Sequence, residues 1–311
     1  MFTGFCVIEN LADFRDFIEI MCTSEERNSP MRQRRKSIIF VILFLTFIGI
    51  MDYPFLSRIY NEHVQGGVVT AYEETFASMD EEIYTRMLED AHAYNQALTD
   101  GILSGITDAF SDGGRKDSTY LSLLSVDEDG TMGVLWIPKL GLELPIYHGT
   151  SEDVLQKGVG HLEGSSLPVG GSGTHTCLSA HRGLPSKTLF TNLDQMKEGD
   201  VIYVSVLGET MAYEVYGTQT VLPYETEALE IQPGKDLVTL ITCTPYGINT
   251  HRLYVHGKRI PYEENAELIE QEKVALESFW SRYWWVAVTV FLLLWMILPL
   301  YRMNRKETDD R

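Results

Sequence analysis

The 311-residue sequence predicts a mainly β domain, a barrel or a sandwich, preceded by a helical region and enclosed between two membrane-spanning helices. From residue 133 onward, short runs rich in β-branched and aromatic residues alternate with Gly, Pro and Asp, as strands and turns do. Before them, apolar residues recur every three or four positions, which is typical of an amphipathic helix. Near each end, an apolar run has roughly the 20 residues needed to cross a hydrocarbon core.

Residues 37–56 and 283–301 are the predicted membrane spans. Asp52 is the only charged residue of the first span, and the second has none. Basic residues precede the first span and follow the second, and since they favour the cytoplasmic side, both termini should be cytoplasmic and the intervening domain extracellular. The alternatives are a buried core helix for either span and a cleaved signal peptide for the first. No small-residue cleavage site follows the first span, which disfavours the signal peptide.

The composition predicts seven segments. Cytoplasmic tails are expected at residues 1–36 and 302–311, beside the spans at 37–56 and 283–301. Between the spans we expect an extracellular helical region with a long loop at 57–132, a β domain at 133–262 and a helical linker at 263–282. We assign no function to residues 1–30, because Met31 opens a run that would itself be a normal start for an N-terminal anchor.

Within the helical region, one long amphipathic helix is expected, with its apolar face at positions 72, 76, 79, 83, 87, 91, 94 and 98. A Gly/Ser/Asp-rich loop follows at residues 100–119, and loops of this length are often lids or binding loops. A short helix is expected near residues 189–196. Seven strands are expected, at residues 134–137, 142–147, 174–180, 201–207, 210–217, 237–242 and 252–257.

Charge and motif content exclude several functions. The formal net charge is −19 and the pI about 4.8, so the chain repels phosphate backbones and nucleic acid is not an expected partner. No zinc-protease, CxxC, P-loop or dinucleotide-binding pattern is present, and no paired-carboxylate signature, so neither a metal nor a cofactor is expected. The glycine-rich run at residues 170–173 is interpreted as a turn, not a phosphate cradle, because no basic residue or helix start follows it.

Two cysteines lie in the extracellular part, and Cys243 is the better candidate nucleophile. It ends an apolar strand just before a turn-rich loop, where reactive side chains become accessible. The eight-residue loop 244–251 can bring Arg252 beside it, and a guanidinium there favours a thiolate. Cys177 lies inside a predicted strand and is interpreted as a small buried filler. A Cys177–Cys243 disulfide is possible in an oxidising setting, but it would remove both extracellular thiols.

The proton partner of Cys243 stays open from spacing alone. His181 ends a predicted strand and precedes Arg182 and Gly183, so it can face an open site, whereas His251 adjoins Arg252 and is a rival. His181 is also four residues from Cys177, roughly 13 Å along a strand, which is too far for a direct proton transfer between those two.

Several blocks of the sequence resemble one known family. The run TLITC at residues 239–243 resembles the TLxTC signature of the sortases. The longer run TLITCTPYGINTHRL, with the blocks LPIYHGT, GVGHLEGSSLPVGG, SAHRGLPSKTLFTNLD and GDVIYV, resembles class C sortases, the pilin polymerases of Gram-positive bacteria. The resemblance covers about residues 50 to 302, and the two-span layout fits class C.

This resemblance implies a sortase-type eight-stranded β-barrel and a set of site residues. Carried over by motif, Cys243 is the nucleophile, His181 is the acid/base and Arg252 stabilises the oxyanion. Class C enzymes often carry a lid with an Asp-Pro-aromatic motif, and the loop here contains Asp108 and Phe110 with Ala109 in place of the proline. Losing that proline makes the loop more flexible before it docks.

The implied reaction is thiol transpeptidation. The enzyme cleaves an LPxTG-like sorting signal between Thr and Gly and passes the acyl group to a lysine amine of another pilin subunit, so pilin subunits and membrane lipid are the expected partners. The acyl enzyme conserves the energy of the cleaved bond, and no ATP is needed. The alternatives are a housekeeping sortase that attaches proteins to peptidoglycan and a catalytically silent membrane scaffold.

Overall fold

The computed structural model describes residues 30–101, 106, 108–110, 118–127, 130–263 and 284–294, with side chains of the first helix described from Ser37 onward. The chain divides into two compact units, Met1–Asp52 and Tyr53–Arg311. The first unit contributes the beginning of helix α2 (Pro30–Ala77), and the second contains the rest of α2, the barrel and the remaining elements.

Helix α2 carries the first predicted span. Over the described residues, its segment Ser37–Ala77 is the one helix long and apolar enough to cross a membrane, and its most apolar window is not buried within the structure. Of the second predicted span, the structure describes an apolar helix at Trp284–Leu294, and the remainder lies outside the described residues. The second span therefore stays a prediction, as do the tails and the linker.

The prediction of one long amphipathic helix is wrong, because two helices share its apolar stripe. Helix α2 ends at Ala77, and α3 (Glu81–Thr99) begins after Asp80, whose backbone is extended at φ −67° and ψ 138°. Glu81 and Glu82 form the first turn of α3, and carboxylates there interact favourably with the helix dipole. The apolar period continues across the break, so periodicity alone did not reveal it.

The domain is an eight-stranded closed barrel, as the sortase resemblance implied. Its strand order is β1-β2-β3-β4-β7-β8-β6-β5. The strands are β1 (Thr131–Ile137), β2 (Leu142–His148), β3 (Val159–His161), β4 (Thr174–Ser179), β5 (Val201–Val206), β6 (Glu209–Val221), β7 (Asp236–Thr244) and β8 (His251–Ile260).

All seven predicted strands are present, and β3 is the one the sequence did not reveal. With only the residues Val, Gly and His, β3 is too short to show an alternating pattern. The short helices are α4 (Ser118–Ser122), α5 (Glu152–Lys157), η1 (Pro138–Leu140), η2 (Leu189–Gln195) and η3 (Glu227–Leu229), of which η2 is the helix expected near residues 189–196.

Alternation along the strands separates the barrel interior from an outer face. In β7, Val238 and Leu240 belong to the main core, whereas Ile241 packs in a second cluster on the other side of the sheet. In β4, Leu178 likewise belongs to the core and Cys177 to the second cluster. Because successive side chains point to opposite faces, Thr239, Ile241 and Cys243 share the outer face.

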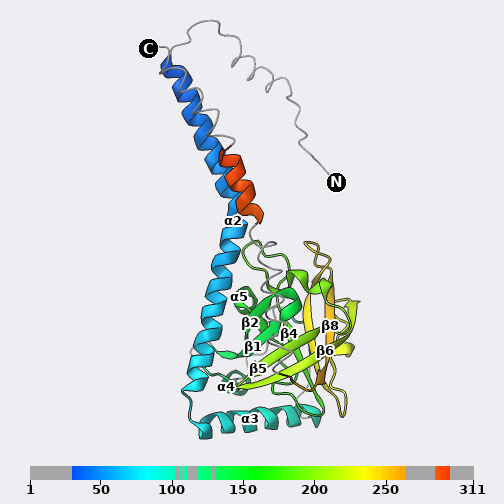
Figure 1. Cartoon of the computed structure of the whole chain (residues 1–311). Coiled ribbons are helices and arrows are strands. Elements are labelled where there is room, and N and C mark those ends of the chain that lie inside the picture. Colours follow the sequence, from blue (N-terminus) through cyan, green and yellow to red (C-terminus); the bar gives the residue numbers. More distant parts are fainter. Residues whose placement is uncertain are drawn as a thin grey trace. The chain divides into compact units, whose positions relative to one another are not determined.

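Helix α3 crosses one end of the barrel and is held there by buried hydrogen bonds (Figure 1). The Asn95 side chain donates to the carbonyl of Leu167 at 3.1 Å and accepts from the amide of the same residue at 2.7 Å. The Thr99 hydroxyl donates to the carbonyl of Gly173 at 2.9 Å. Since α3 leads directly into the loop at residues 100–119, these bonds anchor the start of that loop.

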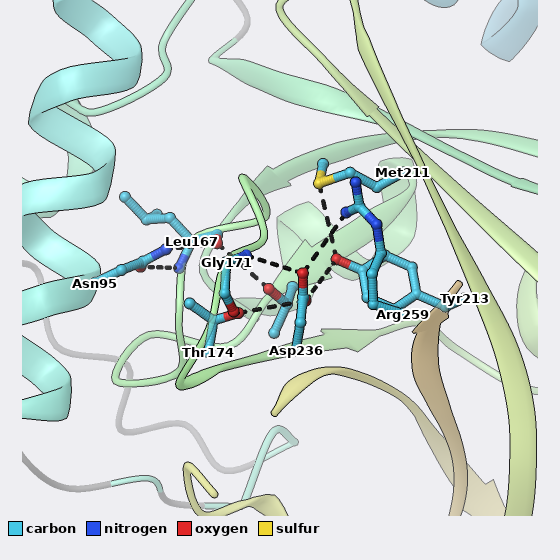
Figure 2. Close-up of polar contacts among 9 residues, drawn as sticks. Asn95, Leu167, Gly171, Thr174, Met211, Tyr213, Asp236 and Arg259 are labelled. Atoms are coloured by element: carbon cyan, nitrogen blue, oxygen red, sulfur yellow. Dashed lines mark hydrogen bonds and ion pairs between the residues drawn. The ribbon is translucent and has the colours of Figure 1, made fainter. Parts of the chain in front are cut away.

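The glycine-rich run at residues 170–173 is a turn, as predicted. The anionic group that its backbone binds is the carboxylate of Asp236. Figure 2 shows Asp236 at the centre of this cluster, where it accepts from the amide of Gly171 at 2.9 Å and from the Tyr213 hydroxyl at 3.1 Å. Gly170 has φ +64°, and a Cβ there would lie 2.9 Å from the Met211 sulfur and 3.0 Å from Asp236, so only glycine fits.

Replacing Asn95 with alanine should lower the free energy of unfolding by about 1–3 kcal/mol, because it leaves the buried amide of Leu167 without a partner and removes one of the donors to the carbonyl of the same residue. Urea unfolding followed by circular dichroism measures the change. The control is Gln96→Ala, which removes an exposed bond to Asp100 on the same helix. Equal stability of the two variants would contradict the anchoring role.

Candidate active site

Cys243 and Arg252 face each other across the β7–β8 pair. The two strands are antiparallel, and their register places Cys243 directly opposite Arg252. Side chains in directly opposed positions have Cβ atoms about 4.5–5.5 Å apart, so the proximity that the loop length predicted is present in the structure.

His181 reaches the same place from the other side of β7. Strands β4 and β7 are parallel, and the last residue of β4, Ser179, pairs with Ile241. The amide of Ala180 donates to the carbonyl of Ile241 at 3.2 Å, so the two backbone segments stay paired beyond the end of β4. Two residues further along each chain come His181 and Cys243. The thiol therefore lies between a histidine-bearing and an arginine-bearing strand.

The Cys243 thiol is covered. Its residue is 8% exposed, and burial raises the pKa of the thiol. The Arg252 guanidinium lowers this pKa and the Asp108 carboxylate raises it, and the net direction is upward. In this arrangement Cys243 is mainly a thiol at neutral pH, not the thiolate that a nucleophile requires.

The loop residues Asp108 and Phe110 contact the other two candidate residues of the site, Arg252 and His181. Asp108 accepts two hydrogen bonds from Arg252, from Nε at 2.7 Å and from Nη2 at 2.6 Å. Burial works to lower the pKa of Arg252, but the hydrogen bonds to Asp108, together with the electrostatic effects of Cys243, Asp108 and Tyr254, raise it on balance. The guanidinium carbon lies 5.0 Å from the centroid of the Phe110 ring, and the ring centroids of Phe110 and His181 are 5.9 Å apart.

Ala109 docks this segment on the outer face of the barrel. It is 2% exposed and belongs to the second apolar cluster, with Cys177, Ile241 and Tyr254 among its members. The methyl group of Ala109 is buried in this cluster, so the segment packs on the barrel although it lacks the proline. The substitution in the expected Asp-Pro-aromatic pattern therefore leaves the docked geometry of Asp108 and Phe110 in place.

The imidazole of His181 is near the thiol but not hydrogen-bonded to it. Within the described ranges, no hydrogen bond joins His181 to the sulfur of Cys243, and Nε2 of His181 is buried without a hydrogen-bond partner. The Oε1 atom of Glu152 lies 3.3 Å from Nε2 of His181, within ion-pair distance but without forming a hydrogen bond. No sequence pattern pointed to Glu152, because only folding brings α5 beside His181.

The other candidates occupy structural positions. Cys177 is fully buried, burial raises the pKa of its thiol to about 12, and both cysteines are free, so the predicted buried filler is confirmed. The rival His251 pairs with Thr244, one position beyond Cys243, and its Nδ1 contacts the Thr250 hydroxyl at 2.9 Å.

Arg182 is a further buried group that the sequence did not single out. It bonds to the Thr244 hydroxyl at 3.0 Å, the carbonyl of Thr191 at 3.2 Å and the Asp194 carboxylate at 2.6 Å. These bonds tie the segment after β4 to the end of β7, which keeps His181 and Cys243 at adjacent chain ends. The guanidinium of Arg182 is engaged by these three partners, whereas Arg252 is the arginine directly opposite Cys243.

A thiol, an imidazole and a guanidinium on adjacent strand ends are the groups that a cysteine acyl-transfer site requires. A protein-family model described as a sortase domain matches residues 135–260. The chain is 46% identical to Streptococcus pneumoniae sortase C, covering 63% of this chain and 97% of that one with a TM-score of 0.59. The chain belongs to the sortase family, whose members are cysteine transpeptidases, and class C sortases are among the solved structures to which it is similar.

Other relatives give the same family. Sortase C-1 of Actinomyces oris is 47% identical, with 58% of this chain and 99% of that one covered and a TM-score of 0.55. Sortase D of Bacillus subtilis (strain 168) is 34% identical over 131 residues, which is 41% of this chain and 63% of that protein. The chain thus spans somewhat less than two thirds of that curated relative.

Asp108→Asn and Phe110→Ala should each speed alkylation of Cys243 by iodoacetamide. Asp108→Asn removes a charge that raises the pKa of the thiol, so the midpoint of the rate against pH should also move to lower pH. A fall of about one pKa unit gives roughly tenfold more thiolate at neutral pH. Asp100→Asn, an exposed carboxylate at the start of the same loop, is the control. An unchanged rate in both variants would refute the lid assignment.

Proposed function

We propose that this chain is a pilus-assembly sortase. It cleaves an LPxTG-like sorting signal between Thr and Gly and joins the acyl group to a lysine amine of another pilin subunit. The observation that carries the proposal is the position of Cys243 between His181 and Arg252 at the strand ends, beneath a loop whose Asp108 binds Arg252. Sortase C1 of a group B Streptococcus pilus island, 42% identical with a TM-score of 0.58, supports the pilin substrate.

In the first half-reaction, the Cys243 sulfur attacks the carbonyl carbon of the threonine. Arg252 donates hydrogen bonds to the oxyanion that forms, and His181 supplies the proton that the departing glycine amine needs. The thioester keeps the acyl group activated. In the second half-reaction, a lysine amine attacks the thioester, its proton passes to His181 and the thiolate of Cys243 departs.

The loop must move before this reaction can proceed. Asp108 occupies Nε and Nη2 of Arg252, which are the donors that an oxyanion would use. It also raises the pKa of the nucleophile. Departure of one segment therefore frees the oxyanion donor and favours the thiolate at the same time. We infer that Asp108 and Phe110 form a lid that keeps the resting enzyme closed.

The proposed location is the cell membrane, with the barrel on the extracellular face and both termini in the cytoplasm. The apolar length of Ser37–Ala77 supports an N-terminal anchor. The second anchor at residues 283–301 and the orientation follow from the sequence, through its apolar run and the distribution of basic residues. Pilin subunits would then meet the enzyme at the surface from which they are exported.

Cys243→Ala should abolish pilin polymers in cells, because no other group in the site can form the thioester. Immunoblots of cell-wall extracts measure this as loss of the high-molecular-weight ladder. Cys177→Ala is the matched control, since that thiol is fully buried and should be dispensable. Persisting polymers would exclude Cys243 as the nucleophile. Intact polymers with loss of singly anchored proteins would favour the housekeeping alternative.

Arg252→Lys should lower kcat by about 10²–10³-fold, the typical loss for one oxyanion donor. A lysine keeps the charge but cannot reproduce the planar fork of donors that Asp108 now engages. The measurement is turnover of a fluorogenic sorting-signal peptide. The control is Arg259→Lys, at the barrel end that contains Asp236. Near-normal turnover would remove Arg252 from catalysis.

A further inference from the structure

Glu152 presents a carboxylate to the buried nitrogen of His181. Its Oε1 lies 3.3 Å from Nε2 of His181, and that nitrogen has no hydrogen-bond partner. The Glu152 side chain is 61% exposed, whereas the His181 side chain is 18% exposed. The pair therefore has one member in contact with solvent and one inside the site.

Apart from His181, which is cationic only when it is protonated, Glu152 has no cationic partner within the described ranges. Its Oε1 accepts one hydrogen bond, from Nε2 of Gln156 at 2.9 Å. The neighbouring cations are engaged elsewhere: Lys187 donates to the carbonyl of Gln156 at 2.5 Å, and Arg182 pairs with Asp194. A carboxylate beside the proposed base thus retains most of its capacity to accept hydrogen bonds from an incoming cation.

The helix that carries Glu152 is held in place. Leu155 of α5 is 2% exposed, and a Cβ at Gly160 would lie 3.0 Å from its side chain, so α5 packs tightly on β3. Gln65 of α2 donates to the carbonyl of Lys157 at the end of α5 at 3.1 Å. The position of the carboxylate is therefore set by the fold, not by a mobile loop.

We propose that Glu152 is the binding residue for the acceptor, which is a primary alkyl ammonium. The inference rests on the proposed function, because it concerns the lysine side chain that resolves the thioester. An ammonium forms charge-assisted hydrogen bonds to a carboxylate, and Glu152 would hold it within reach of Nε2 of His181. Glu152 positions the acceptor, and His181 remains the group that takes the proton.

The protons balance in this arrangement. The acceptor arrives as an ammonium and loses one proton to solvent, with which Glu152 is in contact, to become the free amine. The amine attacks the thioester, and its second proton passes to His181, which had given its own proton to the departing glycine amine. The C–S bond breaks, the new C–N bond remains, and the Cys243 thiolate and the His181 imidazolium are restored.

The test compares a cationic acceptor with a neutral one. The full-length protein carrying Asp108→Asn, with and without Glu152→Gln, is given a sorting-signal peptide and either Nα-acetyl-lysine amide or hydroxylamine, which is uncharged at neutral pH. Glu152→Gln should lower kcat/KM for the lysine acceptor relative to hydroxylamine by about 5- to 30-fold, the loss of one charge-assisted hydrogen bond. Glu152→Asp should restore part of the preference.

The matched control is Asp153→Asn, which removes an exposed carboxylate from the next position of the same helix and should keep the wild-type preference. A preference unchanged by Glu152→Gln would overturn the acceptor site, as would an equal loss with both acceptors, which would mark a structural effect on His181. Absence of any thioacyl enzyme before substitution at Glu152 would instead refute the proposed function, and the acceptor site with it.

Discussion

The pairing of β7 with a parallel strand on one side and an antiparallel strand on the other is the constraint on which the site depends. Because β4 and β7 are parallel and in register, their carboxyl ends lie side by side. The segment after Ser179 therefore lies at the level of Cys243. Antiparallel pairing with β8 brings the start of that strand to the same level. His181, from a distant part of the sequence, meets Cys243 and Arg252 because three strand ends coincide.

A second constraint is the ion pair between Asp108 and Arg252. Both side chains are largely buried, at 16% and 8% exposed, and their two short hydrogen bonds satisfy most of the charge that burial would otherwise penalise. Removing either partner leaves an unpaired charge in the site. Arg252 can therefore exchange Asp108 for another anion at little cost, and the oxyanion of an acyl-transfer reaction is such an anion. The guanidinium donors that bind Asp108 in the loop are thus the ones that can bind the oxyanion of the substrate.

The sequence predicted most of the strands and the Cys243–Arg252 proximity, because both depend on short-range pattern and loop length. It did not predict β3, which is too short for periodicity, or the break between α2 and α3, where the apolar period continues. From the residues alone, the choice between His181 and its rival His251 stayed open, and the parallel β4–β7 pairing that separates them has no local signature. Only the family resemblance pointed to His181. Glu152 was missed for the same physical reason: its position depends on the packing of α5 against β3.

The position of Glu152 helps to explain how one site can release one amine and then accept another. The glycine amine must leave and the lysine amine must enter, and His181 serves both by giving and then taking one proton. A transferase needs a reason for an amine to reach the thioester before water does. Strong negative net charge makes cations accumulate at the surface, and the Glu152 carboxylate beside the base gives one of them a defined place. Preference for an amine over water then follows from local concentration and orientation.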